Sequence, residues 1–180
     1  MIDQGKIKNK GFTLIEVLVY VTILGITSLV IILFINQLFG VMETSRRIRE
    51  ATDNARRSID TIAQEIRHAK TVYTPTSVFG GTAGQLSLET ARDLPTDHDT
   101  TFVDFYLDNG QLFLKREGQA AQRITGEKIK VTALTFQNYN GTTSWPAIQT
   151  TITLQYRDPI NGPKNSVTLT TSTVLRALQL

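Results

Sequence analysis

A long apolar run between Phe12 and about Ile35 is the feature that most constrains what this chain can fold into. One carboxylate, that of Glu16, and a few Thr, Ser and Gly residues interrupt it. At a rise of about 1.5 Å per residue, a helix over this run would extend roughly 36 Å, which exceeds the hydrocarbon core of a bilayer. The run therefore predicts a helix that can cross a membrane.

Glu16 is unusual because it stands near one end of this apolar run, four positions after Phe12. A carboxylate at the centre of a bilayer costs about 2.5–3.5 kcal/mol on insertion scales. On these residues alone, the simpler interpretation is that the side chain reaches the aqueous interface beside its own amino terminus.

The residues that surround Glu16 form a longer pattern. The string Lys10-Gly11-Phe12-Thr13-Leu14-Ile15-Glu16 resembles the class III, prepilin-type signal of the type IV pilin and pseudopilin superfamily. The stretch Ile23-Leu24-Gly25-Ile26 is similar to one found at the same offset in many pilins. The resemblance implies a structural subunit rather than an enzyme.

The resemblance also implies a role for each residue at this boundary. Prepilin peptidase would cleave the Gly11–Phe12 bond, which Lys10 and Gly11 present at the cytoplasmic face of the membrane, and would methylate the new amino terminus at Phe12. Gly11 has no side chain, so the protease can approach the bond closely. Glu16 would then pair with the amino terminus of Phe12 in an adjacent subunit, an attraction that is strong where water is excluded.

An ordinary secretory signal is the main alternative for the first residues. Its apolar core should be about 7–15 residues long and should precede a small-residue cleavage site. The run here is longer, and no Ala-x-Ala sequence follows it. Lysines precede the run and arginines follow it, so charge counting does not decide its orientation. The resemblance implies a single-pass cytoplasmic (inner) membrane protein, with the leader in the cytoplasm and the globular domain extracytoplasmic, which then enters a pilus or pseudopilus.

A second stretch of helix is predicted from Asn36 to about Lys70, where there is no proline and Gly40 is the only glycine. Apolar or small residues recur at steps of three and four and predict one buried stripe. Its members are Ile48, Thr52, Ala55, Ile59, Ile62, Ile66 and Ala69. The opposite side is charged, with pairs four apart at Arg46–Glu50, Asp53–Arg57 and Arg56–Asp60.

The rest of the chain is predicted to be an antiparallel β domain. The sequence Asp108-Asn109-Gly110 between two apolar runs indicates a hairpin, because Asn and Gly accept positive φ. The apolar phase shifts near Ala133, which indicates a bulge. Strands are expected at residues 85–89, 102–107, 111–115, 129–136, 148–156 and 166–175. The predicted fold class is α+β, a long amino-terminal helix packed on one antiparallel β-sheet. Its parts are a leader at 1–11, a transmembrane half-helix at 12–35, an amphipathic half-helix at 36–70 and a globular β domain at 71–180.

Other candidate sites are weak. The acidic loop at 93–99 lacks the glycine-bearing spacing of a calcium loop, so no metal or other cofactor is predicted. Cysteine is absent, which excludes disulfides and thiolate ligands. The arginines of the helix alternate with acidic residues, a pattern that is typical of a solvated face. The net charge is only +3, so a nucleic-acid partner is not expected.

Several segments are similar to J-type minor pseudopilins. They are Ile59–Ala69, Leu112–Leu114, Ile129–Phe136 and Trp145–Ile148. Many major pilins carry a proline near the position of Leu33, which this chain lacks. The resemblance thus implies a minor pseudopilin or minor pilin that initiates or caps a type IV pilus-like or type II secretion filament. Its partners would be prepilin peptidase, other pilin subunits and membrane lipid. A major pilin, a competence pseudopilin for DNA uptake and an unrelated membrane-anchored binding domain remain alternatives.

Overall fold

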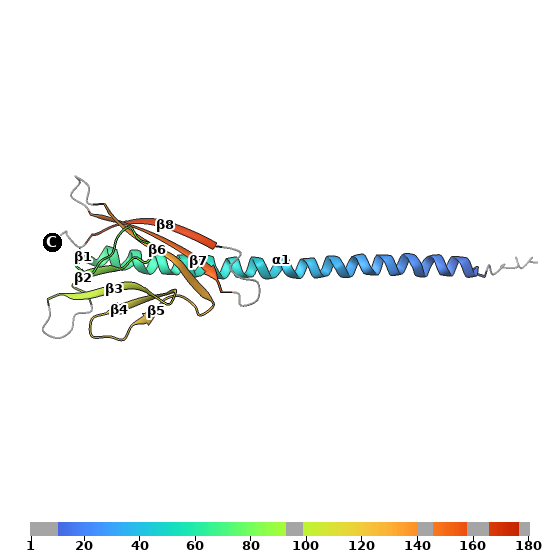
Figure 1. Cartoon of the computed structure of the whole chain (residues 1–180), viewed down its shortest axis with the longest axis horizontal. Helices are drawn as coiled ribbons and strands as arrows, with labels where there is room; N and C mark the ends of the chain where they lie inside the picture. The colour runs from blue at the N-terminus through green and yellow to red at the C-terminus, as the bar shows by residue number, and fades with distance from the viewer. Residues whose placement is uncertain (1–10, 93–98, 140–145, 158–165, 177–180) are drawn as a thin grey trace, which may run out of the picture. The chain divides into compact units, whose positions relative to one another are not determined.

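The computed structural model describes residues 11–92, 99–139, 146–157 and 166–176. The chain divides into two compact units, Met1–Ser45 and Arg46–Leu180. One helix, α1 (Leu14–His68), contributes residues to both units (Figure 1). It continues without interruption through Gly25 and Gly40.

The helix ends two residues earlier than the predicted end at Lys70. Arg67 lies in its last turn, where positive charge is favourable at the carboxyl end of the helix dipole. The hydroxyl of Thr90 donates to the carbonyl of His68 at 3.2 Å. Ala69 then pairs with Thr90 as the first residue of a strand, so the chain changes to β structure at this point.

The second unit contains two antiparallel sheets (Figure 1). The five-stranded sheet has the order β1-β2-β3-β4-β5, and the three-stranded sheet has the order β6-β7-β8. Their bounds are β1 (Ala69–Val72), β2 (Leu86–Thr90), β3 (Thr101–Asp108), β4 (Gln111–Arg116), β5 (Gln122–Arg123), β6 (Ile129–Tyr139), β7 (Ala147–Tyr156) and β8 (Ser166–Val174). The α+β class is confirmed, although the strands form two sheets where one was predicted.

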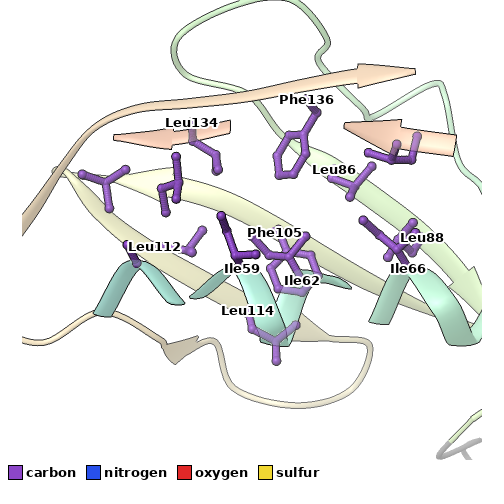
Figure 2. Close-up of a cluster of buried hydrophobic side chains, with 14 of the residues drawn as sticks. Ile59, Ile62, Ile66, Leu86, Leu88, Phe105, Leu112, Leu114, Leu134 and Phe136 are labelled. Carbon is purple, nitrogen blue, oxygen red and sulfur yellow. The ribbon is translucent and has the colours of Figure 1, made fainter. Parts of the chain in front are cut away.

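The hydrophobic core lies between α1 and both sheets (Figure 2). Because burial of one large aliphatic side chain is worth about 1.5–3 kcal/mol, this layer supplies the main force that holds the second unit together. The largest fully buried side chains are those of Ile62, Ile66, Leu86, Leu88, Phe105, Leu112, Ile129, Leu134, Phe136, Ile148, Ile152 and Leu154.

The predicted helical stripe is confirmed from Ala55 to Ala69 and wrong at Ile48. Ala55, Ile59, Ile62 and Ile66 are buried, whereas Ile48 is 40% exposed. Ala51 is buried in its place. A methyl side chain lets the helix approach its neighbours more closely than an isoleucine would, so the smaller residue lies on the inner face.

The local β signals are confirmed. The β3–β4 hairpin turns at Asn109 and Gly110, whose φ angles are 50° and 72°. The β6–β7 ladder shifts register between Val131 and Ala133, at the predicted bulge. Strands β1 and β5 were not predicted, because both are too short to show a period.

Candidate functional site

The start of α1 is the region to which the sequence assigns its functional residues. Gly11, Phe12 and Thr13 precede the helix, which begins at Leu14. Thr13 caps it, because its carbonyl accepts from the amides of Glu16 at 3.1 Å and Val17 at 3.2 Å. The Thr13 hydroxyl accepts a second, longer bond of 3.4 Å from the Glu16 amide, as an N-cap side chain does. Lys10 lies outside the described residues.

Glu16 lies in the first turn of α1 and is exposed. With Thr13 at the cap it has the Thr-x-x-Glu spacing of a capping box. A carboxylate at this end also interacts favourably with the positive end of the helix dipole. Glu16 is therefore compatible with the local structure of the helix start, and its carboxylate remains accessible to a second partner.

Gly11 and Phe12 are both open to the surroundings. No atom lies within 4 Å of the position that a Cβ on Gly11 would occupy. Phe12 is 73% exposed, and its ring makes an edge contact with that of Tyr20 at a centroid distance of 6.4 Å. The peptide bond between Gly11 and Phe12 is thus accessible, and the ring beside it lies along the first two turns of the helix.

The helix surface after this start is almost entirely apolar. Every large hydrophobic residue from Leu14 to Met42 is exposed, and α1 is long and apolar enough to cross a membrane. The hydroxyls of Thr22 and Thr27 donate to the carbonyls of Leu18 and Ile23, at 2.8 and 2.6 Å. Such internal bonds matter in lipid, where no water is present to satisfy a polar group. This part of the helix is suited to burial by lipid or by other helices.

The two glycines of this helix face open space. No atom lies within 4 Å of a Cβ built on Gly25 or Gly40. Gly25 therefore has room for close approach by another helix, as small residues do in membranes. Of the acidic loop at 93–99, only Asp99 lies within the described residues.

One charged pair of the second unit was missed from the sequence. Glu65 is buried on α1, and its carboxylate accepts from the Arg116 guanidinium at 2.6 Å. Glu65 lies within the Ile59–Ala69 segment, but no local signal showed that its carboxylate is buried against a distant arginine. The pair joins α1 to β4 and is structural.

One comparison with known proteins found a match, and this match lies at the start of α1. Residues 6–32 match a family model described as the prokaryotic N-terminal methylation motif. The match covers Lys10, Gly11, Phe12 and Glu16. Neither the curated proteins nor the solved structures contain a match to this chain. The chain therefore carries, at its amino-terminal end, the prepilin-type signal of the type IV pilin and pseudopilin superfamily.

Proposed function

We propose that this protein is a structural minor pseudopilin or minor pilin. Prepilin peptidase would cleave it between Gly11 and Phe12 and methylate Phe12. The observation that carries this proposal is the methylation motif at residues 6–32, which includes the cap and the first, apolar part of α1. The accessible bond at Gly11 and the exposed Phe12 support the processing step.

The exposed apolar surface of α1 suits both environments that the helix would occupy in turn, the membrane and the filament. Before assembly, residues 12–35 would anchor the chain in the cytoplasmic membrane. After assembly, the same surface would pack against the helices of other subunits. Transfer from lipid to a helix bundle releases little hydrophobic free energy, so close packing and polar pairing would decide the register.

Glu16 would supply that polar pairing. It is the only charged residue between Phe12 and Met42. Its carboxylate would pair with the methylated amino terminus of Phe12 in the neighbouring subunit. A single pair of opposite charges in a long apolar surface favours one axial offset over all others, because any other offset leaves both charges buried and unpaired.

The absence of a proline within α1 favours a minor role over the filament shaft. Position 33 is a leucine, and the helix is continuous from Leu14 to His68. The subunit would help to initiate or cap a type IV pilus-like or type II secretion filament. The protein would have no catalytic activity of its own.

The test is to count this chain in filaments sheared from the cells that produce it, by quantitative mass spectrometry. A minor subunit should be present in the filament fraction at a small fraction of the copies of the most abundant pilin. If this chain were itself the most abundant subunit, it would be a major pilin. Its absence from the filament fraction would contradict the proposal.

A further inference from the structure

The edges of the two sheets differ in how well they are protected. In the part of the chain that the structure describes, β1 has four residues and includes Lys70, and β5 has two residues and includes Arg123. Short, charged edge strands resist pairing with another chain. Both edges of the five-stranded sheet are protected in this way.

The β6 edge is protected by a segment of the same chain. The amides of Gly80 and Gly84 donate to the carbonyls of Phe136 and Leu134, at 2.9 and 2.7 Å. The Leu134 amide donates in return to the carbonyl of Thr82 at 2.8 Å. Residues 80–84 thus occupy the middle of this edge.

Strand β8 has none of these protections. Its nine residues, Ser166–Val174, include no charge, proline or glycine. It pairs with β7 without a register shift, and the described residues place no strand on its other side. A long, regular, uncharged edge of this kind is a template for strand addition.

One hydrogen bond shows which residues of β8 bond to β7 and which direct their backbone groups to the open edge. The Leu175 amide donates to the carbonyl of Pro146 at 3.1 Å. Because the direction of these groups alternates along an antiparallel strand, the odd-numbered residues of β8 bond to β7. The even-numbered residues direct their N–H and C=O groups to the open edge, and these are Ser166, Thr168, Thr170, Ser172 and Val174.

A groove of about 290 Å³ lies beside this edge, between β8 and α1. The nearly buried side chains of Ile59 and Ala63 line it. The charged side chains that line it are those of Asp60, Arg67 and Arg176, so the groove has an excess of positive charge. Arg67 and Arg176 are both exposed.

We propose that the β8 edge and this groove bind an extended strand of another polypeptide that carries a carboxylate. The strand would run antiparallel to β8, in line with the rest of the sheet. Arg176 follows the carboxyl end of β8, so the carboxylate should lie near the amino-terminal end of the added strand. Alternate side chains of that strand would contact Ile59 and Ala63. A second copy of β8 would bring no acidic residue to the arginines, which favours a different chain.

The test uses the full chain in detergent micelles and a synthetic probe, the nonapeptide Glu-Thr-Val-Thr-Val-Thr-Val-Thr-Val. Methylation of alternate peptide amides leaves the probe one bonding edge, so it cannot stack on itself. We expect saturable binding by fluorescence anisotropy. Residue-resolved hydrogen exchange should slow at Thr168, Thr170 and Ser172, whereas the odd-numbered amides already bond to β7 and should change little. Absence of binding, or protection elsewhere, would overturn the proposal.

Three variants separate the edge from the charge. Thr170→Pro removes an N–H that does not bond to β7, so β8 should stay folded, and we expect at least about tenfold weaker binding. Thr170→Val keeps the N–H and should bind within about twofold of the wild type. Arg67→Glu, at an exposed position of α1, should weaken binding of the probe up to about fivefold. It should strengthen binding of a second probe that has Lys in place of Glu.

The oligomeric state of the unliganded protein gives a further check. We expect one chain per micelle by light scattering, with fast exchange at Thr170. If the free protein were dimeric, with slow exchange at Thr170, and Thr170→Pro made it monomeric, the occupant would be a second copy and the proposal would be wrong. Binding that is unchanged by both Thr170→Pro and Arg67→Glu would also overturn it.

Discussion

At the scale of single residues, Glu16 has two possible tasks at the start of α1. It can complete the capping box with Thr13, and it can pair with the amino terminus of another subunit. Glu16→Gln separates the two, because glutamine also serves at this capping position but has no charge. We expect Glu16→Gln to be processed normally at Phe12 and to be incorporated into filaments at least about tenfold less than the wild type.

The measurement is an immunoblot of sheared filaments against the membrane fraction of the same cells. Thr13→Ala is the matched control, since it removes the cap and keeps the charge. It should cost about 1 kcal/mol of helix stability and leave filament incorporation largely intact. A Glu16→Gln subunit that assembled like the wild type would contradict the charge-pairing mechanism.

Glu65 is the residue at which charge matters for stability. Its carboxylate is buried and bonds to Arg116, whose side chain is 23% exposed. Removal of one partner leaves the other charge poorly solvated, so we expect Glu65→Ala to lower the free energy of unfolding by about 2–4 kcal/mol. Thermal unfolding in detergent micelles, followed by circular dichroism, measures the change.

The double variant Glu65→Leu with Arg116→Met is the control for that prediction. It replaces both charges by apolar groups of similar length, which is often close to neutral when a buried pair is replaced. It should be more stable than Glu65→Ala. If Glu65→Ala unfolded at the wild-type temperature, the pair would contribute nothing to the fold.

At the scale of elements, α1 stabilises the second unit through one narrow face. Ile62 is fully buried against the sheets, and Ile48, on the same helix, is 40% exposed. Ile62→Ala should destabilise the unit by about 2–5 kcal/mol, because it removes apolar contact and leaves a cavity. Ile48→Ala makes the same chemical change and should cost less than about 1 kcal/mol. If urea unfolding gave equal losses of unfolding free energy for Ile62→Ala and Ile48→Ala, the helix would pack by a different face.

The segment that covers the β6 edge depends on one close approach. A Cβ on Gly84 would lie 2.8 Å from the carbonyl oxygen of Leu134 and 3.0 Å from the Phe136 ring. Gly84→Ala should therefore displace the segment and cost about 1–3 kcal/mol. Gly81→Ala is the control in the same segment, since a Cβ there meets no atom within 4 Å. We expect the displaced segment to show as faster hydrogen exchange at Leu134, and unchanged exchange there would contradict this role.

At the scale of the whole molecule, most of the fold could be predicted because its signals are local. The apolar run, the helical period around Ile59 and Ile62 and the Asn109-Gly110 turn each depend on a few neighbouring residues. The division into two sheets could not be predicted, because it depends on contacts between distant segments. The short strands β1 and β5 have too few residues to show a period, and the Glu65–Arg116 pair joins positions 51 residues apart.

The candidate site divides in the same way. Gly11, Phe12 and Glu16 could be proposed as processing and assembly residues because their motif is continuous in sequence. The cap at Thr13 was missed, although its Thr-x-x-Glu spacing to Glu16 is a recognisable signal. The open edge of β8 was not recognisable from its own residues, because an exposed edge is defined by the strands that do not pair with it.

The function proposed for this protein requires that the motif at residues 6–32 act as a signal for processing and assembly. The most direct test is the intact mass and amino-terminal sequence of the membrane-extracted protein, expressed with and without an active prepilin peptidase. We predict a chain that begins with N-methylated Phe12 when the peptidase is present, and a chain that still carries its leader when the peptidase is absent. A chain that kept Gly11 and the residues before it in the presence of the active peptidase would contradict the account.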